Sequence, residues 1–212
     1  MKKSVLLCFI YCVSVCFCMA QRAEALFEEA SKTYEKANGI SAQFTMNIQS
    51  QKQGSLESFE GTIQMKGDKF VLITPDTRTW YDGTTQWTYI VSTDEVYPTT
   101  PSGDDLQFVN PMILLRTYKT GFNLTYQGES TAETGKPVYD LQLTSQGKSD
   151  VERIDIQIEK ATSFPVRMTV YMKNGIRNLI RISQMLTGVN QPDSFFVFNP
   201  TDYPNAIEID LR

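Results

Sequence analysis

Apolar and polar residues alternate along most of the chain after position 40. A period of two residues is typical of a strand that buries one of its faces. The alternating segments lie at 40–49, 59–65, 70–72, 77–81, 86–91, 122–126, 139–143, 154–158, 164–172 and 176–182. The pairs Asp82-Gly83 and Asn174-Gly175 favour tight hairpin turns between strands. The pattern therefore predicts an antiparallel sheet with one apolar face, and a sheet of roughly ten or more strands curls or closes.

Two segments follow a different pattern. Residues 22–38 carry apolar side chains near helical spacing, and Asn38-Gly39 supplies a signal that ends a helix. We expect one amphipathic helix whose apolar face is made of Ala25, Leu26, Ala30, Thr33, Tyr34 and Ala37. Residues 98–121 begin as a loop and contain the run PMILL at 111–115. Because proline suits the first turn of a helix, we expect one or two short apolar helices there.

The start of the chain has the layout of a secretory signal peptide. A short basic region precedes an apolar run that is too short for a membrane span, which needs roughly 20 apolar residues. Ala20 is a suitable residue before a cleavage site. A lipoprotein signal is the alternative, but neither Cys16 nor Cys18 follows the small residue that such a signal requires. We therefore expect a cleaved signal peptide at 1–20 and a single exported domain at 21–212.

Charge and composition argue against several kinds of function. The chain has 20 basic and 24 acidic residues and a net charge of −4, and losing Lys2 and Lys3 changes this charge to −6. That balance argues against a nucleic-acid partner, which requires a basic surface. The chain has no histidine, and its four cysteines all precede residue 21. The mature chain therefore has no Ser-His-Asp machinery, no ordinary zinc site and no disulfide.

Carboxylates are the remaining candidates for catalysis. Asp104, Asp105, Glu129, Glu133 and Asp155 offer the residue type that works in pairs in glycoside hydrolysis. Scattered surface acids are the simpler interpretation, because nothing in the sequence fixes their separation. We expect a protein that is not an enzyme, with no catalytic residues, no metal and no cofactor.

The apolar face of so large a sheet needs a cover. In one interpretation the N-terminal helix and the 111–115 segment fill the curled sheet as an ordinary core. In the other they enclose a ligand cavity, because apolar pockets favour the mouths of barrels. Methionine adapts to variable apolar partners, so the second interpretation gains some support from Met46, Met65, Met112, Met168, Met172 and Met185.

Five segments follow one another in an order typical of one family. They are ISAQFT at 40–45, ESFEGTIQMKGDKF at 57–70, YDGTTQWTY at 81–89, NPMILL at 110–115 and FFVFNP at 195–200. They resemble, in turn, the opening strand, the glycine-to-phenylalanine strand, the DG-x-x-x-W-x-Y segment, the proline-led lid helix and the closing strand of the LolA outer-membrane lipoprotein carriers. Each motif is short, and the resemblance rests on their order across essentially the whole mature chain.

The resemblance implies a fold and a function together. The fold is mostly β (α+β), an incomplete antiparallel barrel or half-barrel of about 10–12 strands covered by the N-terminal helix and a short helical lid. The function is that of a monomeric carrier in the periplasm of a Gram-negative bacterium. Such a carrier takes triacylated lipoproteins from an inner-membrane lipoprotein-releasing ABC transporter to an outer-membrane acceptor. The alternative is a lipid or lipoprotein sensor, or an assembly adaptor, with the same half-barrel, which would usually have a second domain or an anchor.

The resemblance also implies which residues bind the acyl chains. Candidates for the cavity wall are Phe44, Met46, Ile63, Met65, Phe70, Trp80, Trp87, Ile156, Met168, Ile180 and Ile182, with plain core packing as the alternative for each. The lid candidates are Met112, Ile113, Leu114 and Leu115, and we expect Leu115→Glu to abolish loading without unfolding the protein.

One position departs from the family pattern. Family members have an arginine, thought to tie down the lid, directly after the strand lysine, whereas here Lys66 is followed by Gly67. Lys66, Lys69 and Arg116 are therefore the candidates for a different latch.

Overall fold

A helix at residues 21–36 is followed by a sheet of twelve strands in the described part of the chain. The computed structural model describes residues 21–101, 106, 114, 119, 121–147, 149–210 and 212. The strands are β1 (Ile40–Ser50), β2 (Gly54–Lys66), β3 (Lys69–Ile73), β4 (Thr77–Tyr81), β5 (Gln86–Ile90), β6 (Glu95–Thr99), β7 (Phe122–Thr131), β8 (Pro137–Ser145), β9 (Val151–Glu159), β10 (Pro165–Met172), β11 (Ile176–Thr187) and β12 (Ile207–Glu208). No helix among these residues is long and apolar enough to cross a membrane.

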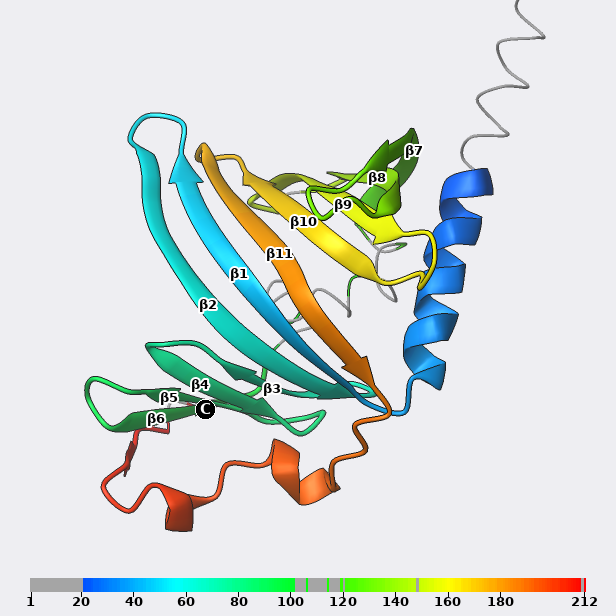
Figure 1. Cartoon of the computed structure of the whole chain (residues 1–212). Helices are drawn as coiled ribbons and strands as arrows, with labels where there is room; N and C mark the ends of the chain where they lie inside the picture. The colour runs from blue at the N-terminus through cyan, green and yellow to red at the C-terminus, as the bar shows by residue number, and fades with distance from the viewer. Residues whose placement is uncertain are drawn as a thin grey trace, which may run out of the picture.

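The sheet is open and curled. Its strand order is β12-β6-β5-β4-β3-β2-β1-β11-β10-β9-β8-β7, and β12 is the strand that pairs in parallel, with β6. The long central strands bend so that the β3–β6 wing and the β7–β9 wing lie on either side of a concave face (Figure 1). A register shift between Gln43 and Phe44 is of the kind that adds local twist. The predicted half-barrel of mostly antiparallel strands is therefore confirmed.

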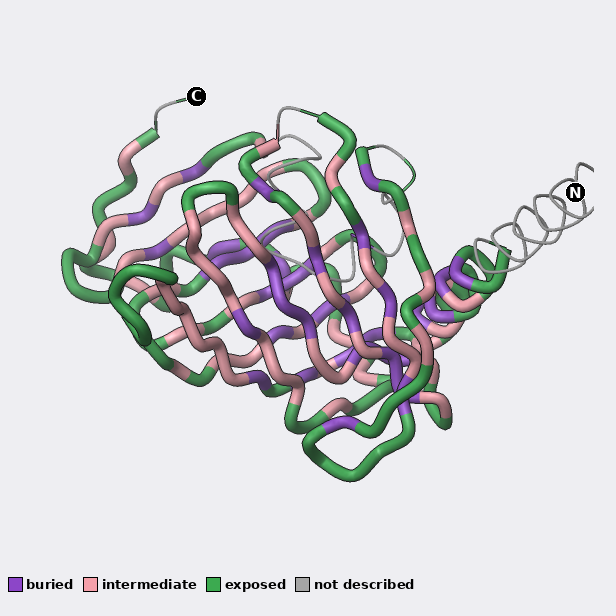
Figure 2. The backbone as a smooth tube through the Cα atoms, turned by 90° about the horizontal axis from the view of Figure 1, so that it is seen from above, coloured by how far each residue is buried: buried purple, intermediate pink, exposed green. Residues whose placement is uncertain are grey.

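The hairpin turns follow from their residues. Gly83 and Gly175 have φ angles of 102° and 83°, a region that glycine enters without the steric cost of a Cβ atom. Both lie where the pairs Asp82-Gly83 and Asn174-Gly175 predict a turn. Between the turns, buried and more exposed residues alternate along the strands (Figure 2).

The N-terminal helix buries one stripe of side chains. Ala23, Phe27, Ala30 and Tyr34 are buried, and their spacing of three or four residues places them on one helix face. The expected apolar face was partly wrong, because Ala25 is exposed and Phe27 is fully buried. A stripe through Phe27 buries a large aromatic ring, whereas a stripe through Ala25 buries only a methyl group.

Two apolar clusters lie on opposite faces of the sheet. The concave-face cluster joins the helix, the central strands and both wings, and it includes the helical residues Leu106 and Leu114. The convex-face cluster consists of Val71, Trp80, Tyr89, Val96, Phe196 and Phe198. The other lid and latch residues predicted from the sequence (Met112, Ile113, Leu115 and Arg116) lie outside the described residues.

The C-terminal segment, residues 188–210, packs on the convex side of the β3–β6 wing (Figure 1). The closing strand expected at 195–200 is wrong, because Asp193–Phe196 and Pro200–Asp202 form two short 3-10 helices, η1 and η2. Prolines before η1 and at the start of η2 interrupt extended pairing, since proline lacks the N–H that a sheet requires. The strand that ends the sheet is β12, where the N–H groups of Ile207 and of Ile209, the residue after the strand, donate to the carbonyls of Asp94 and Val96.

Candidate functional site

A continuous row of apolar side chains crosses seven strands of the concave face. Residues paired across neighbouring strands point to the same face of a sheet. The register of six adjacent pairs aligns Phe59, Met46, Ile180, Met168, Ile156, Leu141 and Tyr126 on β2, β1, β11, β10, β9, β8 and β7. The central residues of this row therefore form one apolar wall rather than separate patches.

Most of the candidate wall residues come together in this cluster. Those that belong to it or pack against it are Phe44, Met46, Ile63, Met65, Phe70, Ile156, Met168, Ile180 and Ile182. Met46, Ile180 and Ile182 are only partly buried, so the middle of the wall is less well covered than the end near Met65 and Phe70. Leu114, one of the lid candidates, is 1% exposed within the same cluster.

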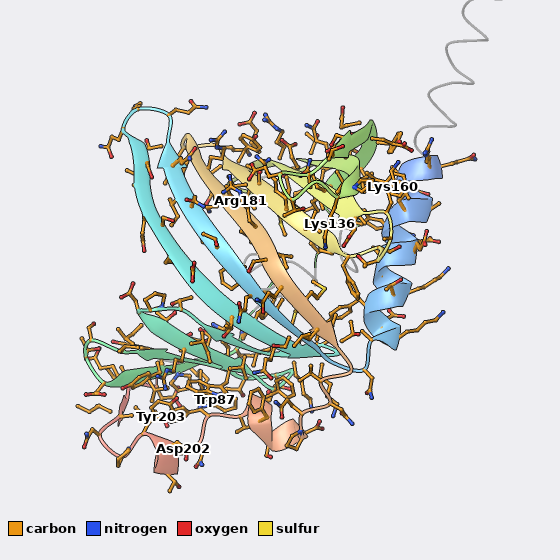
Figure 3. All side chains as sticks on the ribbon, viewed as in Figure 1. Trp87, Lys136, Lys160, Arg181, Asp202 and Tyr203 are labelled. Atoms are coloured by element: carbon orange, nitrogen blue, oxygen red, sulfur yellow. The ribbon has the colours of Figure 1, made fainter. Side chains whose placement is uncertain are left out.

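Trp80 and Trp87 lie on the other face, and their expected place in the wall was wrong. Trp80 pairs with Val71 and with Trp87, whereas the concave residue Phe70 pairs with Tyr81. Because neighbouring residues of a strand point to opposite faces, the two tryptophans face the C-terminal segment. Figure 3 shows Trp87 on that side, near Tyr203. There Trp80 contacts Phe198 and Tyr203, each with ring centroids 5.4 Å apart.

Lys66 and Lys69, two of the latch candidates, hold the C-terminal segment. Lys66 Nζ donates to the Gln191 carbonyl at 2.9 Å, and Lys69 Nζ lies 2.7 Å from Asp193 Oδ2. Hydrogen bonds from Lys69 and then Lys66 lower the pKa of the Asp193 carboxyl. These contacts join β2 and β3 to Gln191 and to the first residue of η1.

Gly67, at the position of the family arginine, joins the sheet to the N-terminal helix. The Tyr34 hydroxyl donates to the Gly67 carbonyl at 2.8 Å. The turn between β2 and β3 therefore contacts the helix through Gly67 and the C-terminal segment through Lys66 and Lys69.

The other end of the helix is tied to the opposite wing. Arg22 Nη2 donates to Glu129 Oε1 at 2.6 Å, and the Arg22 guanidinium lies 4.6 Å from the centre of the Tyr126 ring. Lys160 also pairs with Glu129, and its hydrogen bond is the main cause that lowers the pKa of that carboxyl. The helix thus spans the concave face between β7 and the turn after β2.

Several residues of the wall were not among the candidates. Leu141, Leu143, Ile154, Val170 and Phe122 are buried in the same cluster. Each lies in a segment whose alternation predicts a strand, so the signal was present. Their face could be assigned only once the strand order was known, because alternation alone does not say which face is concave.

The site offers apolar contact rather than reactive chemistry in the described residues. No group of three or more His, Cys, Asp or Glu side chains comes together there in a way that could hold a metal ion. Tyr81 is a polar member of the concave cluster, and its burial, followed by the nearby Asp68 and Asp82, raises the pKa of its hydroxyl. The phenol therefore stays neutral at physiological pH.

Comparison with solved structures supports the same fold. The chain is similar to an uncharacterized conserved protein from Thermus thermophilus, with a TM-score of 0.59 and 13% identity over 89% of this chain and 99% of that one. It is also similar to an outer membrane lipoprotein-sorting protein domain from Vibrio parahaemolyticus, with a TM-score of 0.50 and 11% identity over 84% and 97% of the two chains. Identities this low support a shared fold alone.

Sequence comparison gives the family. No match is found among curated protein sequences. The family model of the outer membrane lipoprotein carrier protein LolA matches residues 16–175, a span from the end of the signal-like region to the β10–β11 turn. Because this match covers most of the chain, the protein belongs to the LolA family of outer membrane lipoprotein carriers.

Proposed function

We propose that this protein is a periplasmic carrier that binds the acyl chains of lipoproteins against its concave face. It would take them from the inner to the outer membrane of a Gram-negative bacterium. The main support is the apolar row across seven strands, in which Met46 and Ile180 remain only partly buried. A finished protein core buries such side chains, whereas a binding surface leaves them available to a ligand.

The energetics fit a carrier that depends on its partners. Each methylene group removed from water contributes about 0.8 kcal/mol, so several acyl chains give a large gross affinity that ordering costs reduce. Release then requires a partner whose binding favours an open state. The expected partners are an inner-membrane lipoprotein-releasing ABC transporter on loading and an outer-membrane acceptor on release, with the carrier acting as a monomer.

The direct test is native mass spectrometry of the protein purified from its host periplasm. We expect masses that correspond to bound lipoprotein or acyl lipid. A consistently empty protein would contradict transport and favour a packed assembly adaptor.

A pair of neighbouring substitutions tests the face that binds. Met46→Glu puts a carboxylate into the apolar row, and we expect at least a tenfold loss of lipopeptide binding because a charge in an apolar site is strongly unfavourable. Asn47→Glu is the matched control, because Asn47 is the next residue of β1 and points to the convex face. Equal binding by the two variants, with both folded, would contradict the assignment of the concave face.

A further inference from the structure

Polar atoms without partners interrupt the apolar concave face. In the described part of the chain, Asn178 Oδ1 and Ser145 Oγ are buried and have no hydrogen-bond partner. Buried polar atoms are almost always paired in folded proteins, so each exception requires an explanation. Both residues belong to strands of the wall, and a bound ligand could supply the missing hydrogen bonds.

Asn178 lies in the row next to the one through Met46. It pairs with Ile48 on β1 and with Val170 on β10, and Ile180 follows it on the same face of β11. Val170 is buried in the concave-face cluster, and Ile180 packs against it. The neighbours of Asn178 on the concave face are therefore the apolar residues Ile48, Val170 and Ile180, and its Oδ1 has no partner although the residue is only partly buried.

Ser145 lies near the same end of the sheet. It is the last residue of β8 and pairs with Phe122, which belongs to the concave-face cluster. The turn after β8 reaches the β10–β11 hairpin, where the Lys173 N–H donates to the Asp150 carbonyl at 2.9 Å. Asn178 and Ser145 thus lie at the hairpin end of the wall, away from the helix end where Met65 and Phe70 are buried, whereas Gln86 Oε1, also without a partner, lies on β5 of the other wing.

This placement suits a ligand with a polar junction and a long apolar tail. From Asn178 to Met185, β11 runs for about 23 Å at roughly 3.3 Å per residue. That exceeds the roughly 15 Å of hydrocarbon in one leaflet of a bilayer. An acyl chain can therefore extend from Asn178 towards the helix with its polar junction beside the carboxamide.

The chemistry of the junction follows from the carboxamide. Asn178 presents a carbonyl oxygen that accepts and an amino group that donates. A secondary amide offers an N–H and a carbonyl and so matches both, whereas an ester has no N–H and would leave the buried oxygen unpaired. We propose that Asn178 recognises the amide that joins an acyl chain to the N-terminus of a lipoprotein. This inference rests on the proposed carrier function and names the part of the lipoprotein that the protein recognises.

Two lipopeptides that differ in one atom test the proposal. One is N-hexadecanoyl-glycyl-serine amide, and the other has an ester oxygen in place of the first N–H. We expect the purified protein to bind the amide about tenfold more tightly, the effect of one hydrogen bond to a buried acceptor. In Asn178→Leu this ratio should fall to about one, because the variant has no carboxamide oxygen to accept the N–H that distinguishes the amide from the ester. Asn47→Leu, on the convex face of β1, should keep the tenfold ratio.

The outcomes separate the two levels of the proposal. Equal binding of both lipopeptides to the unaltered protein would overturn amide recognition and leave the carrier function standing. Binding of neither would overturn the carrier function itself. A ceramide of the same chain length that binds more tightly than the lipopeptide would overturn the lipoprotein as the source of the amide. The comparison in the unaltered protein needs no variant, so it holds even if Asn178→Leu fails to fold.

Discussion

Gly61 shows how one residue shapes the concave face. A Cβ atom at this position would lie 2.5 Å from Cζ of Phe44 and 2.8 Å from the carbonyl oxygen of Ile73. The Phe44 ring therefore lies against β2 where a side chain is missing. We expect Gly61→Ala to destabilise the protein by about 1–3 kcal/mol, the usual cost of overpacking, seen as a lower urea concentration at the midpoint of unfolding.

Gly147 provides the matched control for that substitution. A Cβ atom there would meet no other atom within 4 Å, and the residue has no positive φ, so Gly147→Ala should change stability by less than about 0.5 kcal/mol. A similar loss in both variants would mean that the Phe44 ring does not depend on Gly61.

The sequence alone assigns only some of the wall residues to the correct face of the sheet. Alternation correctly groups Phe44 with Met46, and Ile180 with Ile182, because each pair lies two residues apart on one strand. It fails for the tryptophans, since Trp80 stands next to Tyr81 and both faces of β4 are aromatic. Only the packing of the C-terminal segment against Val71 and Trp80 decides which of these aromatic rings faces outwards.

Among the elements, the C-terminal segment was the least predictable. Its phenylalanines suggest a strand, but they fill the convex face of the β3–β6 wing instead. What holds the segment is not local in sequence, because Asp193 meets Lys66 and Lys69 across more than a hundred residues. Contacts at such separation leave no periodic signal in the sequence, whereas the β10–β11 hairpin is predicted by its own turn residues.

The attachment of the C-terminal segment should depend on pH. The pKa of Asp193 lies below its ordinary value of 3.8 because of Lys69 and Lys66. A lowered carboxyl pKa stabilises the folded form above the ordinary value, and that contribution is lost as the pH falls below it. We therefore expect the segment to loosen below pH 3.8. The chain's two tryptophans lie beneath the segment, so their fluorescence emission should shift to longer wavelength in that range.

Asp193→Asn separates this effect from general acid unfolding. The variant lacks the ion pairs at every pH, so its tryptophans should already be more accessible to acrylamide quenching at about pH 7, where the carboxyl of the unaltered protein is charged. Its emission should then change less below pH 3.8 than that of the unaltered protein, because the variant has no carboxylate to protonate there. Identical titration curves for the two proteins would exclude Asp193 as the pH-dependent attachment.

At the scale of the whole molecule, the number of alternating strands was enough to predict a curled sheet. The order of the strands was not, because β1 pairs with both β2 and the distant β11, and nothing local encodes the second pairing. The role of the helix was equally difficult to predict from the sequence. Its amphipathic pattern predicts one buried face, while the structure adds that its two ends are tied to opposite wings.

That bridging position predicts that the helix controls the separation of the wings. The Tyr34 hydroxyl holds the β2–β3 turn at one end, and Arg22 holds Glu129 on β7 at the other. Every cysteine precedes residue 21, so a protein that begins at residue 21 accepts spin labels at Ser92→Cys on one wing and Thr134→Cys on the other without further changes. We expect Arg22→Gln with Tyr34→Phe to broaden the distribution of distances measured by pulsed electron paramagnetic resonance, since the apolar stripe alone leaves the ends free to shift.

Glu35→Gln, on the exposed face of the same helix, is the control and should leave the distribution unchanged. An equally narrow distribution in the unaltered protein, the double variant and Glu35→Gln would mean that packing of Phe27 and its neighbours fixes the wings by itself.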